Sequence, residues 1–194
     1  MTQPESRAPG DPFARGPYRA RVQGFSVFDV DGVLADVGHR RHHLVRRDWE
    51  AFFAAAADDP PLRTGITLAR QCADAGLTPV YLSGRPERLR AVTAAWLEAH
   101  RLPSGELVLR PNRDRSPAPR LKLRLLRSLA ARGDIVTFVD DDSWVVDAVR
   151  AARPPLVRGE VFLADWQPDD GLDGARGDAG RRAMRRAQRV EGRT

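Results

Sequence analysis

The sequence predicts an α/β fold built on a parallel β-sheet with helices over both faces. Two observations predict it. Short apolar runs typical of strands alternate with stretches of helical periodicity, and polar clusters follow the three clearest strands. Alternating strands and helices form βαβ units, in which parallel strands end at the same edge of the sheet. We therefore expect one globular domain with its functional residues at that edge.

The strands are predicted from their apolar, β-branched and aromatic composition. Residues 22–30, 77–82 and 135–139 are the clearest, because each is a buried-type run bounded by turn or polar residues. Residues 107–109 and 161–163 are shorter candidates of the same kind.

Helices are predicted where apolar residues recur three or four positions apart, in residues 64–75, 86–100, 120–131 and 143–152. Gly76 ends the first, Pro86 opens the second at its first helical position, and Ser143 is expected to cap the last. Residues 44–61 are expected to form one further helix. Its aromatic residues pack on the body of the domain or face the site as a flap: Trp49, Phe52 and Phe53.

Composition excludes several classes of protein. The chain has 194 residues, 42% of them hydrophobic and 30% charged, which is typical of a globular domain. Its longest apolar run, residues 51–57, is far shorter than the ~20 residues that span a membrane, and its N-terminus lacks the apolar region of a signal peptide. Cys72 is the one cysteine and forms no internal disulfide. We expect a cytoplasmic protein without membrane contact, whose oligomeric state the sequence does not indicate.

The ends of the chain differ from its middle. Residues 1–23 are rich in Pro, Gly and Arg and are expected to be disordered. Residues 168–194 are expected to form a flexible tail that closes with a short basic helix, RRAMRRAQRV. Residues 24–167 are then the folded domain.

Positive charge is concentrated within that domain. The net charge is +6, and Lys122 is the one lysine among 32 basic residues. Residues 85–132 carry 12 basic side chains against four acidic ones, a local excess of eight. Such a stretch attracts a polyanion or a phosphate, or it is a solvated arginine-rich surface.

Polar clusters directly follow the three clearest strands. They are Asp29 and Asp31 with Gly32, then Ser83, Gly84 and Arg85, then Asp140, Asp141 and Asp142. Each cluster alone has an ordinary explanation as a turn or a solvated loop, but their shared place at successive strand ends favours catalysis. Carboxylates gathered at one edge repel one another unless a cation neutralises them, and oxygen ligands of this kind suit Mg²⁺.

The same clusters offer groups for phosphate chemistry. Asp29 is a carboxylate of the kind that forms an aspartyl-phosphate. Ser83 and Gly84 precede a helix N-terminus, where hydroxyl and backbone N–H groups hold phosphate oxygens. Lys122 can bring its ammonium group to the same anion.

Three histidines, His39, His42 and His43, follow the first cluster. The sequence leaves three interpretations open for them: a solvated or substrate-facing loop, a phosphate contact, or a metal site. No cysteine or carboxylate spacing typical of zinc accompanies them. Trp144 and Trp166 near the third cluster are candidates to stack on a base.

The order of FDVDGVLAD, YLSGR, Lys122 and FVDDD resembles the haloacid dehalogenase (HAD) superfamily of Mg²⁺-dependent phosphotransferases, over residues 24–166. The stretches LSGRPERLRAVTAAWLEAH, LVLRP and FVDDDSWVVDAV are similar in layout to the 3′-phosphatase domain of polynucleotide kinase-phosphatases. The resemblance implies a HAD-like Rossmannoid three-layer sandwich with a central parallel sheet and a small cap insert, about residues 37–63.

The resemblance also implies roles for the carboxylates. Asp29 would attack phosphorus and become an aspartyl-phosphate. Asp31 would protonate the leaving oxygen and then deprotonate the hydrolytic water. Asp29, the backbone carbonyl of Asp31 and Asp141 would hold Mg²⁺, and Asp140 would support the metal or its water.

Substrate contacts are implied in the same way. Ser83 and Gly84 would bind the phosphoryl oxygens, and Lys122 would neutralise the phosphoryl group and the nucleophile. Arg85 and Arg88 would grip a second part of the substrate.

The substrate is expected to be a phosphomonoester, because Asp31 supplies an acid two residues after Asp29. A 3′-phosphorylated nucleic-acid end is the first expectation, although Asp142 stands where the polynucleotide family often has a basic residue. The alternatives are a phosphatase of nucleotides or other small phosphomonoesters, and a non-catalytic module that binds phosphate or nucleic acid. Lys122 is followed by Leu123, so the chain has no P-loop of a kinase.

Overall fold

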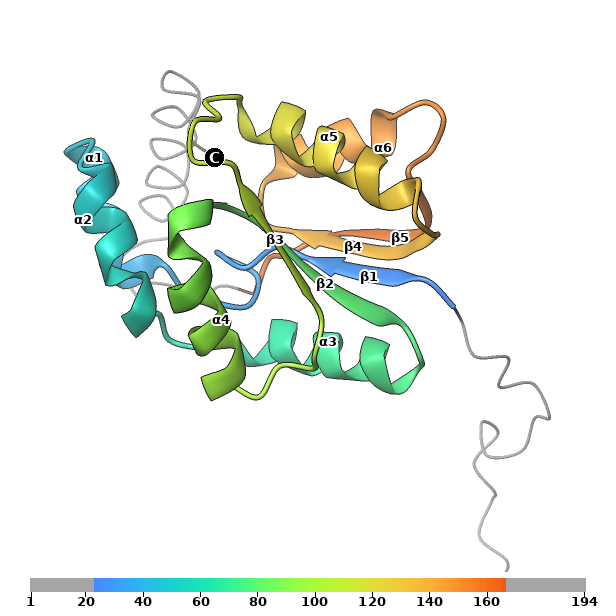
Figure 1. Cartoon of the computed structure of the whole chain (residues 1–194), viewed down its shortest axis with the longest axis horizontal. Helices are drawn as coiled ribbons and strands as arrows, with labels where there is room; N and C mark the ends of the chain where they lie inside the picture. The colour runs from blue at the N-terminus through green and yellow to red at the C-terminus, as the bar shows by residue number, and fades with distance from the viewer. Residues whose placement is uncertain (1–22, 167–194) are drawn as a thin grey trace, which may run out of the picture.

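The computed structural model describes residues 23–166, and its centre is a five-stranded sheet (Figure 1). All strand pairs are parallel, in the order β3-β2-β1-β4-β5. The strands are β1 (Phe25–Phe28), β2 (Thr78–Pro86), β3 (Glu106–Arg110), β4 (Ile135–Asp140) and β5 (Val157–Leu163). This confirms the predicted α/β fold with a central parallel sheet. The expectations for the two tails lie outside the described residues.

Helices cover both faces of the sheet (Figure 1). One face carries α3 (Arg63–Asp74) and α4 (Arg90–Ala99), and the other carries α5 (Ala118–Ala130) and α6 (Ser143–Ala151). Side chains of a strand alternate between the two layers, so Val27 packs with α5 and α6 whereas Phe28 packs with α3 and α4. None of the helices in this part of the chain is long and apolar enough to cross a membrane.

Some predicted boundaries are corrected. Pro86 does not open a helix: its backbone is extended and pairs with Arg110, and a 3₁₀ turn, η3 (Glu87–Leu89), precedes α4. Asp142, not Ser143, caps α6, because its carboxylate accepts the Trp144 backbone N–H. The last strand begins before the predicted apolar residues, since β5 lies at an edge of the sheet where exposed polar side chains are tolerated.

The predicted helix over residues 44–61 is divided in the structure. Arg47 has φ of +56°, which interrupts the helix, and the Asp48 carboxylate then caps a new one by accepting the Ala51 N–H. The elements of this insert are η1 (Gly38–Arg40), α1 (Arg41–Val45), α2 (Trp49–Ala54) and η2 (Ala55–Asp58). The aromatic residues are buried with Leu44 in a small cluster apart from the core of the sheet, and Leu89 packs against it: Trp49, Phe52 and Phe53.

Candidate active site

The predicted carboxylates meet at the carboxyl ends of β1 and β4. Asp29, Asp140 and Asp141 each place a carboxylate oxygen within 4.8 Å of the others. Asp29 and Asp140 are buried, so their mutual repulsion is not screened by water. A hard divalent cation such as Mg²⁺ fits this all-oxygen set.

Gly32 shapes the loop that follows Asp29. Its φ of +78° lies in the left-handed region, and a Cβ atom on it would come closer than 3.0 Å to the Asp141 carboxylate. A side chain at this position would therefore displace Asp141. The glycine permits both the turn after β1 and the approach of the third carboxylate.

Lys122 reaches the carboxylates from α5. Its Nζ donates to Asp29 Oδ2 and to Asp140 Oδ2, each at 2.6 Å, and the side chain is buried. Although burial lowers it, the two carboxylates raise the pKa of Lys122 above its usual value. Burial raises the pKa of Asp29 well above its usual value, which the charge of Lys122 opposes. Lys122 thus keeps a positive charge beside the predicted nucleophile.

Asp31 is held by two arginines. Its Oδ1 accepts from Arg85 Nε at 2.9 Å, Arg85 Nη2 at 2.6 Å and Arg40 Nη2 at 2.9 Å. Burial raises the pKa of Asp31, but the charges of Arg85 and Arg40 outweigh it and lower the pKa to about 2. The two guanidinium groups therefore fix the orientation of the carboxylate and favour its ionised form.

Asp59 holds both arginines from the opposite side. It is buried, and it accepts from Arg40 Nε and Nη2 at 2.6 Å each and from Arg85 Nη2 at 2.5 Å. His39 Nε2 lies 2.8 Å from its Oδ1. Arg40 and Asp59 belong to the predicted cap insert, so this insert positions Asp31. The sequence analysis did not identify either residue.

Arg85 differs from its expected role. Its side chain is fully buried, and its hydrogen bonds go to Asp31, Asp59 and Thr93. The expectation that Arg85 grips substrate is therefore corrected: in this structure it orients Asp31. Arg88 is exposed, with its guanidinium carbon 5.6 Å from the ring centre of Phe53, and remains at the open side of the site.

Ser83 and Gly84 end the regular part of β2 next to these carboxylates. Ser83 is buried, and its Oγ accepts the backbone N–H of Arg85 at 3.2 Å. Gly84 is partly exposed. The two residues lie within β2, where its pairing with β3 is irregular, and η3 separates them from α4, so the predicted position directly before a helix N-terminus is corrected.

Comparison with known proteins agrees with this geometry. Residues 24–157 match the model of the family described as the polynucleotide kinase PNKP phosphatase domain. The chain belongs to this family. It is therefore a phosphatase domain of the HAD type, a phosphoric monoester hydrolase, and the resemblance of its motifs to that superfamily is confirmed.

Solved structures share the fold of this phosphatase domain. One, titled "Structure of Pnkp1/Rnl/Hen1 complex", has a TM-score of 0.61 at 21% identity and covers 74% of this chain and 46% of its own. The class C acid phosphatase from Bacillus anthracis with tungstate bound has a TM-score of 0.51 at 16% identity, and covers 82% of this chain and 78% of its own. The phosphatase domain thus spans less than half of the protein it matches in the first structure. No curated protein matches the chain.

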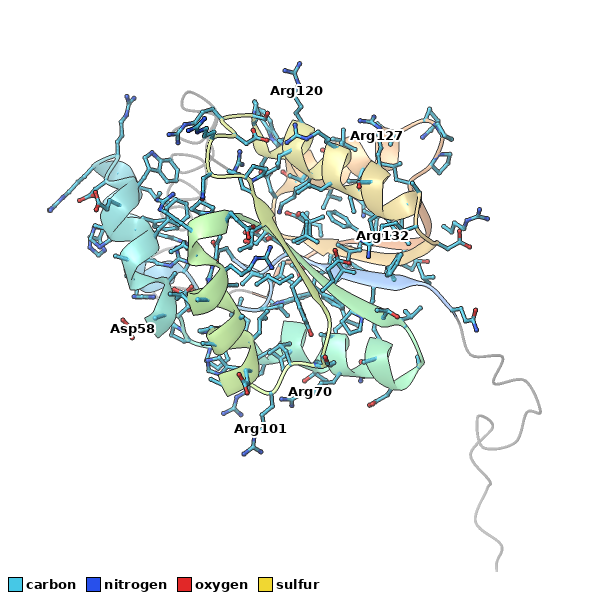
Figure 2. All side chains as sticks on the ribbon, in the orientation of Figure 1. Asp58, Arg70, Arg101, Arg120, Arg127 and Arg132 are labelled. Atoms are coloured by element: carbon cyan, nitrogen blue, oxygen red, sulfur yellow. The ribbon has the colours of Figure 1, made fainter. Side chains whose placement is uncertain are left out.

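The basic residues of the phosphatase domain are not gathered on one face. Lys122 and Arg85 are buried, and Arg90 and Arg132 pair with Glu87 and Glu106. Figure 2 shows Arg120 and Arg127 on α5 and Arg132 beyond the end of that helix, whereas Arg101 lies at the opposite edge of the molecule. The positive charge of residues 85–132 is therefore spread over several parts of the surface and the interior, and only some of these residues lie near the active site.

The three histidines do not form part of a potential metal site among residues 23–166. The one group of three or more potential ligands there is Asp29, Asp140 and Asp141. His39 instead faces Asp59, and the ring of His42 lies 3.9 Å from that of His43. The Trp166 indole donates to the Val33 carbonyl and packs against the core, so it is not placed to stack on a base.

Asp59 offers a test of how the phosphatase domain positions Asp31. Asp59→Ala leaves two buried guanidinium groups with half of their counter-charge, so we expect a loss of about 3 kcal/mol in unfolding free energy. We also expect a fall in kcat at temperatures where the variant is folded, because Asp31 loses its fixed orientation. Thermal unfolding and phosphate release measure the two effects.

The neighbouring Asp58 provides the matched control. It is exposed and points into solvent (Figure 2), so Asp58→Ala should change neither unfolding nor activity. Equal behaviour of Asp58→Ala and Asp59→Ala would contradict the role of the buried carboxylate.

Proposed function

We propose that this chain is a Mg²⁺-dependent phosphomonoesterase that acts through an aspartyl-phosphate and removes 3′-phosphate groups from nucleic-acid ends. The observation that carries the proposal is the meeting of Asp29, Asp31, Asp141 and Lys122 at one edge of the sheet. A binding module would need the cation site but would not need two arginines that orient Asp31.

The first step of the proposed reaction forms a bond between Asp29 and phosphorus. An Asp29 oxygen attacks, the bond from phosphorus to the ester oxygen breaks, and Asp31 gives a proton to the departing alkoxide. Ser83, Gly84 and Lys122 hold the phosphoryl oxygens as their charge is redistributed. The products are a free hydroxyl and the aspartyl-phosphate.

In the second step Asp31 takes a proton from water, whose oxygen attacks the phosphorus and releases inorganic phosphate from Asp29. The low pKa of Asp31 keeps the carboxylate ionised and so able to accept a proton, although it also makes it a weak base. For the first step Asp31 must carry a proton. A dianionic phosphate bound beside it opposes the effect of Arg40 and Arg85 and raises its pKa.

The metal site would be formed by Asp29, Asp141 and the backbone carbonyl of Asp31, with Asp140 in support. Their oxygen donors fit Mg²⁺, and Gly32 leaves space for Asp141 to join them. Bound there, Mg²⁺ would neutralise charge on the phosphoryl group and on the carboxylates.

The family match supports a nucleic-acid substrate. The small insert also supports a nucleic-acid substrate. Its two short helices and 3₁₀ turns cover less of the site than a full domain would, so the end of a polymer can enter. The structures of similar fold titled with Pnkp1, Rnl and Hen1, one of them an RNA repair complex, support action beside partner proteins.

The test is Mg²⁺-dependent phosphate release from a 3′-phosphorylated oligonucleotide and from a 3′-mononucleotide. We expect at least tenfold higher kcat/KM for the oligonucleotide, falling as salt rises, because several backbone phosphates contribute to binding. Equal or better use of the mononucleotide would indicate the small-ester alternative. No release from either substrate would contradict the proposed substrate class.

A further inference from the structure

A shallow cleft opens beside Gly84. It has a volume of about 90 Å³ and lies between the insert, the end of β2 and the loop after β3. Its lining residues include Gly84, Phe53, Arg88, Arg110, Asn112 and Arg115. Pockets that enclose a whole small molecule are several times larger, so this cleft suits a single chemical group.

The cleft is positively charged. Asp114 is the one acidic residue in its lining. Its carboxylate contacts Arg124 on α5, accepts the Ser116 backbone N–H at 2.7 Å and lies 3.9 Å from Arg110 Nη1, so three arginines of the lining face a single carboxylate that is already in contact with other groups. Arg88 and Arg115 are exposed and face the cleft without a carboxylate partner in its lining. An anion is therefore the group that this surface would bind.

Arg110 forms the floor of the cleft. Its Nε donates to the Gly84 carbonyl at 3.2 Å and its Nη1 to the Ser116 carbonyl at 2.7 Å. The side chain therefore connects β2 to the loop that follows β3. Burial lowers the pKa of Arg110 to about 10, an effect that Asp114 opposes and the charges of Arg124 and Arg115 increase, and the side chain stays charged at neutral pH. These crowded like charges would be relieved by a bound anion.

The walls of the cleft are fixed before any ligand binds. The Asn112 carboxamide oxygen accepts the Arg88 backbone N–H at 2.8 Å, which ties the loop after β3 to the start of η3. The guanidinium of Arg88 lies over the ring of Phe53, so a residue of the insert contacts it and limits its movement. A planar guanidinium held in place suits the two-oxygen face of a phosphate.

We propose that this cleft binds the phosphodiester on the 5′ side of the terminal nucleotide, while the 3′-phosphate occupies the site of Asp29. The inference rests on the proposed function. Gly84 lines the cleft and, with Ser83, is also expected to bind the 3′-phosphate, so the two proposed anion sites adjoin. The cleft then distinguishes the end of a polynucleotide from a free 3′-mononucleotide, which has no second phosphate.

The test compares kcat/KM for three substrates: a 3′-mononucleotide, a nucleoside 3′,5′-bisphosphate and a dinucleotide with a 3′-phosphate. The bisphosphate carries an anion at the 5′ position without a second nucleoside, so it separates recognition of phosphate from recognition of a base. We expect the bisphosphate and the dinucleotide to exceed the mononucleotide about tenfold or more. The advantage should fall with rising salt.

Two arginine variants assign this preference to the cleft. Arg88→Ala and Arg115→Ala change exposed residues, and each should lower the ratio of dinucleotide to mononucleotide kcat/KM about tenfold. Arg101→Ala is the control of equal charge and should keep the ratio. Arg101 is not in the lining of the cleft; it follows the C-terminal end of α4, about 15 Å along the helix from Arg90, and Figure 2 shows it at the edge of the molecule.

The outcomes separate the two proposals. Hydrolysis of all three substrates at similar kcat/KM, or a ratio unchanged in Arg88→Ala and Arg115→Ala, would overturn the cleft assignment alone. Failure to hydrolyse any 3′-phosphate, while p-nitrophenyl phosphate is hydrolysed, would overturn the proposed substrate class and the cleft assignment with it. If the dinucleotide exceeds the mononucleotide in kcat/KM but the bisphosphate does not, the preference comes from contact with the second nucleoside, and recognition of the phosphate is overturned.

Discussion

Asp29→Asn is expected to reduce phosphate release by a factor on the order of 10⁴ to 10⁶, the range observed when an enzyme loses its nucleophile. The amide has the shape of the carboxylate but cannot attack phosphorus with a full negative charge. It also removes one of the two carboxylates that contact Lys122. Activity should fall while the fold remains, because the amide oxygen can still accept the Val30 N–H.

Two further measurements assign the effect to Asp29 itself. Acid quenching of the wild-type protein during turnover should trap a phosphorylated peptide that contains Asp29, and the variant should yield none. Asp147→Asn on α6 is the control, since this carboxylate is exposed and belongs to none of the polar clusters. Phosphorylation of another residue, or full activity of Asp29→Asn, would refute Asp29 as the nucleophile. Only a wild-type protein that releases no phosphate from any phosphomonoester would favour the binding-module alternative.

The main features of the fold were predictable because they depend on local pattern. β1, β2 and β4 contain apolar runs, and polar side chains stand at or directly after the carboxyl end of each, so their positions at one sheet edge follow from parallel pairing. Lys122 was predictable in part from its contrast with an arginine-rich chain. Its contacts with Asp29 and Asp140 were not, because they depend on how α5 packs on the sheet.

The support around Asp31 was beyond what the sequence indicates. Asp58 and Asp59 are identical neighbours in an alanine-rich stretch, yet one is exposed and the other is buried between two arginines. The end of η2 decides which side chain turns inward, and no spacing rule marks that point. Arg40 lies among basic residues of similar appearance. Arg85 followed a predicted strand, but only the structure shows that its guanidinium turns inward to Asp31 and Asp59.

Gly32→Ala is expected to reduce Mg²⁺-dependent activity about 100-fold. The new Cβ would overlap the Asp141 carboxylate, so Asp141 must move away from Asp29 and Asp140. Displacing a ligand should weaken Mg²⁺ binding at least as much as the loss of a supporting hydrogen bond, which costs about 10- to 100-fold. A higher Mg²⁺ concentration should restore part of the activity.

Gly76→Ala separates this effect from backbone strain. Gly76 also has a positive φ, +96°, but it is exposed after α3. In both variants an alanine must adopt the left-handed conformation, which lowers the free energy of unfolding by about 1–2 kcal/mol. Only Gly32→Ala should lose the rise in Tm that Mg²⁺ gives the wild-type protein, because a ligand stabilises the folded state in proportion to its affinity. If both variants keep that rise, Asp141 does not hold the metal; if both lose it, strain and not displacement of the carboxylate explains the result.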